Sequence, residues 1–182
     1  MDNHAPNIPR MTAEEYFKAT PETNQPTELR DGEIVSLASP SMEHQSIAGG
    51  VYAELFHFIR QNGGKCKPFV SPADVRLDDR NVVQPDVFVT CKPENLTKQY
   101  LDGAPDFVAE VVSSNRSDDF IRKLYLYQNS GVREYWIIDP FHKKTVVYYF
   151  EDGNHPDIYT FDTPIPVGIY GGKLAIRIAD FL

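Results

Sequence analysis

Residues 105–113 read PDFVAEVVS, and this stretch decides how the rest of the chain is arranged. From Phe107 to Val112 every residue but one is apolar, a pattern typical of a central strand buried on both faces. The exception is Glu110, which has apolar neighbours on both sides. A carboxylate on such a strand costs several kcal/mol unless it is paired, protonated or bound to a metal ion.

Helices and strands are predicted on both sides of this strand. Helical spacing between capping signals, with Ser41 and Ser117 as N-caps, predicts helices over residues 11–19, 41–61 and 117–131. Strand patterns, including a hairpin about Asp31-Gly32, cover residues 28–38, 65–70, 73–77, 82–90, 134–140 and 144–150. The order predicts an α/β class of mixed α+β type: a central mixed sheet flanked by helices, with an added N-terminal hairpin.

Size and composition predict the domain organisation and the compartment. A chain of 182 residues fits one domain, which we place at residues 11–182 after a loose tail at residues 1–10. No apolar run approaches the ~20 residues of a membrane helix, and the N-terminus lacks the apolar core of a secretory signal, so we expect a cytoplasmic protein. Cys66 and Cys91 are then expected as two free thiols rather than a disulfide.

Two further residues strengthen the signal at Glu110. Asp86 follows Pro85 and opens the apolar run of residues 87–90, so it marks the start of a strand. Lys123 lies four residues before Tyr127 on the third predicted helix, which places it at or near the buried side. Two strand-borne carboxylates that converge would hold a hard cation through oxygen ligands. The alternatives are that Glu110 pairs with a core cation, that Asp86 is a turn residue, and that Lys123 is solvated.

The chain resembles the Uma-two family, restriction-endonuclease-like proteins of the P-D…(D/E)-x-K nuclease superfamily. The resemblance spans roughly residues 11–180 and rests on six blocks in the same order: ELRDGEIV, SPSMEH, QPDVFV, GAPDFVAEVVS, the D…K…Y helix and GVREYWIIDP. It implies a restriction-endonuclease-like fold, hydrolysis of DNA with Mg²⁺ (Mn²⁺ as a substitute), and a homodimer.

The resemblance also implies a set of metal ligands. Asp86 matches the P-D element and Glu110 the acid of the second element, so both would bind the metal, with the carbonyl of Val111 completing the site. Glu28 is similar to an upstream acid that helps to hold or orient the metal and its water.

The lysine of the superfamily pattern is displaced in this sequence. It is expected two residues after Glu110, where Val112 stands, and the resemblance implies that Lys123 on the following helix takes its place. His44 falls in the S-P-x-x-x-H block, at the start of the apolar face of its helix. A capped or core histidine is the simpler interpretation of His44.

The overall charge leaves a second function class open. A net charge of −8 and a pI near 5.1 disfavour general nucleic-acid affinity, although carboxylates that bind a metal contribute to that charge. The alternative to a nuclease is therefore an inactive nuclease fold that binds DNA or protein. A serine hydrolase is disfavoured, because Ser113-Ser114 lack a G-x-S-x-G elbow.

Overall fold

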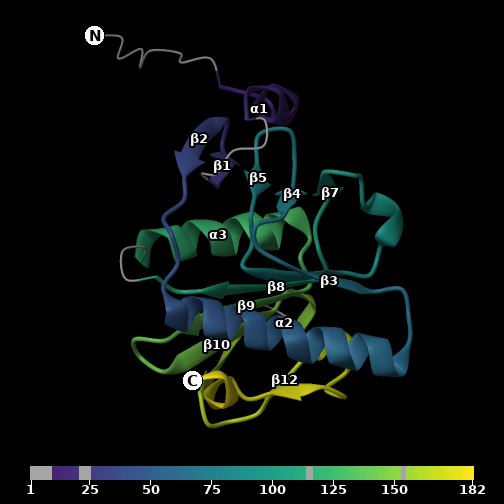
Figure 1. Ribbon diagram of the computed structural model, residues 1–182, viewed down its shortest axis with the longest axis vertical. Helices are drawn as coiled ribbons and strands as arrows, with labels where there is room; N and C mark the ends of the chain where they lie inside the picture. The colour runs from purple at the N-terminus through teal and green to yellow at the C-terminus, as the bar shows by residue number, and fades with distance from the viewer. Residues whose placement is uncertain (1–9, 21–25, 114–116, 153–154) are drawn as a thin grey trace.

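A computed structural model describes residues 10–20, 26–113, 117–152 and 155–182, with only the backbone at residues 117–120 (Figure 1). The predicted tail therefore lies outside the described residues, apart from Arg10. The predicted cap at Ser117 concerns a side chain that is also outside them. Within the described part, no helix is both long and apolar enough to cross a membrane.

A six-stranded mixed sheet forms the centre of the molecule, in the order β11-β10-β9-β8-β6-β3. Its strands β8 and β9 are parallel and the other neighbours are antiparallel. Strand β8 lies between β9 and β6 with all five residues buried, which confirms the buried central strand. The bounds are β3 Lys67–Val70, β6 Val87–Thr90, β8 Phe107–Val111, β9 Glu134–Asp139, β10 Lys144–Tyr149 and β11 Pro156–Thr160.

Two helices cover opposite faces of this sheet (Figure 1). Helix α2, Met42–Asn62, begins at the predicted cap Ser41 and buries an apolar stripe that includes Leu55 against one face. The short strands β12 (Ile165–Pro166) and β13 (Ala175–Ile176) pack on the same side. Helix α3, Ser117–Ser130, packs Tyr127 on the other face.

The predicted hairpin belongs to a second, five-stranded sheet rather than standing alone as an addition to the first. Its order is β2-β1-β5-β4-β7, and helix α1, Ala13–Ala19, packs against it through Tyr16. The hairpin turns at Asp31-Gly32, where both residues have positive φ, as predicted. The bounds are β1 Thr27–Arg30, β2 Glu33–Ser36, β4 Asp74–Arg76, β5 Val82–Val83 and β7 Tyr100–Asp102.

The strand predictions differ from the structure in two places. Residues 82–90 form two strands, β5 and β6, that lie in different sheets, because Pro85 between them has no N–H for a continuous ladder. Residues 91–104, for which no element was predicted, contain strand β7. The described residues also contain short 3₁₀ helices at Pro93–Asn95, Phe150–Asp152, Gly168–Tyr170 and Ile178–Phe181.

The prediction of two free thiols is also wrong, because Cys66 and Cys91 form a disulfide. Strands β3 and β6 are antiparallel with Lys67 paired to Thr90, so the two cysteines stand opposite each other one residue beyond this pair. The spacing of the cysteines along the chain contains no sign of this register. Only the pairing of the two strands brings the sulfur atoms together.

Candidate active site

The register of two central strands places Asp86 opposite Glu110. Strands β6 and β8 are antiparallel, and Val87 pairs with Ala109, so the residue before Val87 and the residue after Ala109 face one another. Asp86 Oδ2 accepts a hydrogen bond of 2.8 Å from the backbone N–H of Val111. The two carboxylates expected to converge are therefore neighbours across one strand pair.

Helix α3 directs two side chains at Glu110. Lys123 Nζ lies 2.8 Å from Glu110 Oε1, and the Tyr127 hydroxyl donates to the same oxygen at 2.6 Å. These two residues are one helical turn apart, so they share a face. Lys123 is 6% exposed and Glu110 is 5% exposed, which confirms the prediction that Lys123 lies on the buried side.

Burial and charge together set the protonation of this pair. Burial, reinforced by the charges of Asp86 and Glu28, raises the pKa of Glu110 to about 7 despite the opposing effect of Lys123. Burial alone would lower the pKa of Lys123, but the charges of Glu110 and Glu28 outweigh it and raise the pKa above its ordinary value. Both effects of the carboxylates favour the ammonium form of Lys123 in a site with little access to water.

Glu28 approaches the same ammonium from the second sheet. Its side chain is fully buried, and Glu28 Oε1 lies 3.5 Å from Lys123 Nζ and accepts the N–H of Gln84 at 3.0 Å. Oε2 accepts Arg30 Nε at 2.6 Å. Burial opposes ionisation of Glu28, but the charges of Lys123 and Arg30 hold its pKa below the ordinary value. Glu28 is thus an ionised anchor for Lys123.

His44, in the first turn of α2, contacts the other carboxylate. Its Nε2 lies 3.1 Å from Asp86 Oδ2, while its Nδ1 is buried without a hydrogen-bond partner among the described residues. Burial lowers the pKa of His44, but the hydrogen bond to Asp86 and the nearby charge of Glu110 raise it overall. His44 therefore lies in the site rather than only in the core of the helix packing.

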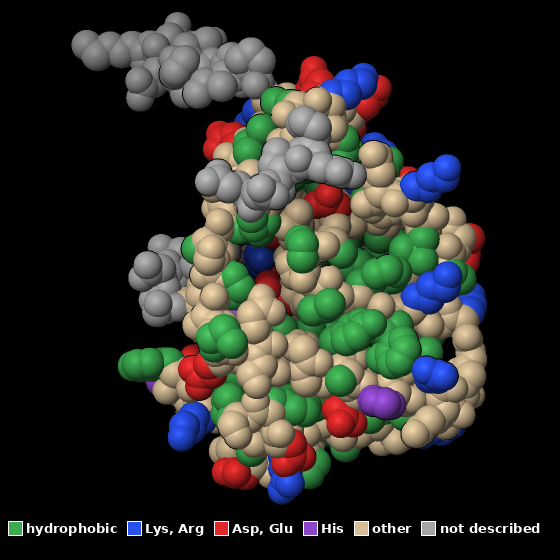
Figure 2. Space-filling model, in the orientation of Figure 1, with side chains coloured by type: hydrophobic (Ala, Val, Ile, Leu, Met, Phe, Trp, Pro, Cys, Tyr) green, Lys and Arg blue, Asp and Glu red, His purple; other side chains and the backbone are tan. Residues whose placement is uncertain are grey.

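All five predicted side chains and Val111 line one hollow of about 100 Å³. In Figure 2, basic and acidic side-chain atoms lie recessed together, at the height of α3 and β8 in Figure 1. Sequence reasoning gave no role to two residues here, Tyr127 and Gln84. The signal for Tyr127 was its spacing of four residues from Lys123, whereas nothing in the sequence pattern marks Gln84 as the partner of Glu28.

The donor atoms in the hollow suit a hard cation. Within the described part of the chain, no group of three or more His, Cys, Asp or Glu side chains is gathered to hold a metal ion. The oxygens available are those of Asp86, Glu110 and the Val111 carbonyl. Among the described residues, hydrogen bonds and ion pairs reach Glu110 Oε1 and Asp86 Oδ2 and leave one oxygen of each carboxylate without a partner. Magnesium binds through one or two carboxylates and keeps several waters, so this donor set fits it.

Comparisons with known proteins agree with this architecture. Residues 13–166 match the model of the Uma2 family, described as "Putative restriction endonuclease". An uncharacterized protein of Synechocystis sp. is 26% identical over 154 residues, which cover 82% of this chain and 80% of that protein. The crystal structure of "a putative nuclease belonging to DUF820" from Anabaena variabilis has a TM-score of 0.77 at 21% identity, over 94% of this chain and 97% of that one. At this identity the likeness shows a shared fold.

Proposed function

Because the chain belongs to the Uma2 (Uma-two) family and has a restriction-endonuclease-like fold, we propose that it is a magnesium-dependent endonuclease acting on DNA. The observation that carries the proposal is the position of Lys123. Its ammonium lies between two buried carboxylates, 2.8 Å from Glu110 and 3.5 Å from Glu28, while Asp86 stands across the strand pair from Glu110. A purely structural core has no need of four buried or half-buried charges at one point.

In this proposal Asp86, Glu110 and the carbonyl of Val111 hold Mg²⁺, for which Mn²⁺ substitutes. A bound magnesium ion supplies a water of lowered pKa and a Lewis acid for a phosphate oxygen. His44 and the N–H of Val111 both contact Oδ2 of Asp86, so they fix the orientation of that carboxylate. The Tyr127 hydroxyl does the same for Glu110.

Lys123 acts on the phosphate. A preorganised ammonium in a site with little water stabilises negative charge that develops on the phosphate oxygens, and losing one such donor costs roughly 10²–10³ in rate. Glu28 is a positioning residue, because both its oxygens are already engaged and it contacts Lys123. The carboxylates repel DNA in the absence of metal and contribute to the acidic balance of the chain.

The alternative is a nuclease fold that binds DNA or protein without hydrolysis. Val112 in place of the expected lysine, and the net charge of −8, support it. A homodimer and a cytoplasmic location also remain proposals: the first is supported by the need for two active sites in double-strand cleavage, and the second by the nuclease family to which the chain belongs.

Cleavage of supercoiled and single-stranded DNA in Mg²⁺ or Mn²⁺ tests the proposal. Asp86→Ala and Glu110→Ala should abolish metal-dependent nicking, and Lys123→Ala should slow it roughly 10²–10³-fold. Glu54→Ala, which removes an exposed acid from α2, is the matched control and should cleave normally.

Two results would contradict the proposal. Cleavage that survives in Glu110→Ala would show that the site is elsewhere. No cleavage with any metal, together with a melting temperature that Mg²⁺ does not change, would favour the binding module, because a scaffold without catalysis has no reason to bind metal.

A further inference from the structure

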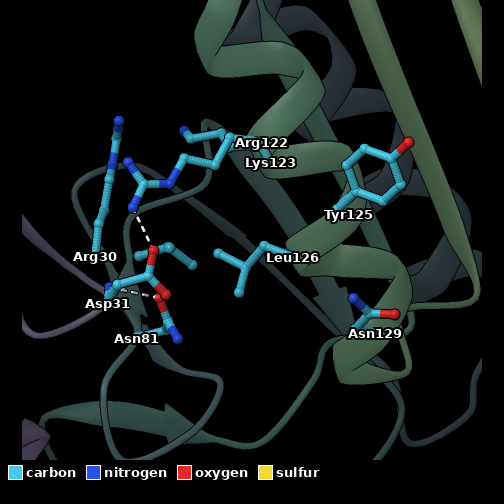
Figure 3. A pocket seen from close by; sticks show the side chains of 9 residues that line it. Arg30, Asp31, Asn81, Arg122, Lys123, Tyr125, Leu126 and Asn129 are labelled. Atoms are coloured by element: carbon cyan, nitrogen blue, oxygen red, sulfur yellow. Dashed lines mark hydrogen bonds and ion pairs between the residues drawn. The ribbon is translucent and has the colours of Figure 1, made fainter. Parts of the chain in front are cut away.

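A second hollow of about 230 Å³ lies beside the proposed active site. Lys123 lines both hollows, so it forms part of the wall between them. The second hollow lies between α3, which contributes Arg122 and Tyr125, and the hairpin, which contributes Arg30 and Asp31 (Figure 3). The two hollows are therefore neighbours on either side of the Lys123 side chain.

The described residues that line this hollow include more cations than acids, unlike the chain as a whole. Among the described residues that line it, Arg30, Arg122 and Lys123 are cationic and Asp31 is the one acid, in a protein whose net charge is −8. Figure 3 shows the three cationic side chains at the same end of the hollow. Nucleic-acid binding draws most of its affinity from cations placed against phosphates, so a local cluster matters more than the overall charge.

The two arginines are held in different ways. Arg30, with a side chain only 12% exposed, is paired with the buried carboxylate of Glu28. Arg122 is 54% exposed and paired with Asp31, which is exposed to the same extent. One guanidinium is therefore fixed by the interior, whereas the other can exchange an exposed carboxylate for an anionic ligand.

The other end of the hollow suits a nucleobase. Tyr125 is 61% exposed, and Asn129 follows it one helical turn later on the same side of α3 (Figure 3). Exposed aromatic rings stack on the bases of single strands without sequence preference. An amide one turn away supplies both a donor and an acceptor for a base edge.

We infer that this hollow binds the nucleotide next to the cleaved phosphodiester bond. Its phosphate lies against Arg122 and Arg30, and its base lies on Tyr125. This inference rests on the proposed nuclease function, because that function defines which phosphodiester bond is cleaved. Binding of a nucleotide in the hollow does not itself depend on hydrolysis.

The competing explanation is that the Arg122–Asp31 pair only ties α3 to the hairpin. The two explanations predict different effects of Asp31→Asn on DNA affinity. If Asp31 competes with a phosphate for Arg122, Asp31→Asn strengthens DNA binding. If the pair only connects α3 to the hairpin, losing it does not strengthen binding. Asparagine tolerates the positive φ of this position, so the substitution is compatible with the turn.

The test is fluorescence anisotropy with a short labelled single-stranded oligonucleotide, in Ca²⁺ and at several salt concentrations. Arg122→Gln should weaken binding roughly tenfold and reduce the salt slope by about 0.7. Asp31→Asn should tighten binding several-fold, and Tyr125→Ala should weaken it while Tyr125→Phe does not. Arg60→Gln, the same charge change near the far end of α2, is the control; it should shift binding less than about twofold, because charges separated by more than a Debye length are screened.

Each outcome decides the inference. The inference is overturned if Arg122→Gln leaves the DNA affinity, the salt slope and the melting temperature unchanged. It is also overturned if Asp31→Asn binds DNA equally or more weakly, or if the unmodified protein does not bind the oligonucleotide. Cleavage of the same oligonucleotide in Mg²⁺ is scored separately. Variant effects on binding without any cleavage would support the hollow and refute the nuclease, whereas cleavage without variant effects would refute only the hollow.

Discussion

Replacing Lys123 with methionine removes the ammonium and keeps a flexible stem of similar length. In the natural protein the ammonium lies 2.8 Å from Glu110 and 3.5 Å from Glu28, and all three side chains are almost fully buried. Removing one partner of a buried ion pair leaves an uncompensated charge and costs about 3–5 kcal/mol. Glu28 keeps Arg30 as a partner, so most of the uncompensated charge is on Glu110.

The cost should depend on pH, because Glu110 can take up a proton instead. Its folded-state pKa is about 7, against about 4.3 in an unfolded chain. Between these values the folded protein holds a proton that the unfolded chain has released, so stability falls as pH rises. Lys123 lowers this pKa, so its loss moves the folded-state value above 7. At pH values above this raised pKa, each pKa unit of the increase destabilises the Lys123→Met protein by about a further 1.4 kcal/mol.

Urea denaturation in a chelator at pH 6 and pH 9 measures this difference. At pH 6 Glu110 is mostly protonated in both proteins, and the loss should be about 1–2 kcal/mol from hydrogen bonds alone. At pH 9 it should approach the full 3–5 kcal/mol. Lys98→Met, at an exposed lysine, is the control and should change little at either pH. An equal loss at both pH values in Lys123→Met would refute the coupling of Lys123 to Glu110.

Two other predictions concern stability away from the site. A Cβ at Gly49 would meet no atom within 4 Å, whereas one at Gly50 would lie 2.3 Å from the ring of Phe181. In urea denaturation, Gly49→Ala should therefore stabilise the protein by up to about 1 kcal/mol, and Gly50→Ala should destabilise it by about 1–3 kcal/mol. Stability changes of the same sign in both variants would contradict the packing. Reducing the Cys66–Cys91 disulfide should lower the free energy of unfolding by about 3 kcal/mol. The stability of the Cys66→Ser/Cys91→Ser protein should no longer depend on reductant. A natural protein that is equally stable with and without reductant would show that the disulfide does not contribute.

Local patterns in the sequence were sufficient for the main elements of the fold. The apolar run around Glu110, the helical spacing from Ser41 and the turn at Asp31-Gly32 each reflect which side of a segment is buried. That information is local, because the side-chain period of a helix or strand is set by its own backbone geometry. The same reasoning placed Lys123 on a buried face, and the structure confirms it.

The identity of each partner was decided only by the tertiary structure. The sequence around Glu28 gives no sign of its partners, yet its carboxylate accepts the backbone N–H of Gln84, 56 residues away, and contacts Lys123. The cysteines showed no pairing signal until β3 and β6 were placed side by side. Hydrophobic patterning specifies that a residue is buried but not what it meets, because the register between distant segments depends on how the two sheets and α3 pack together.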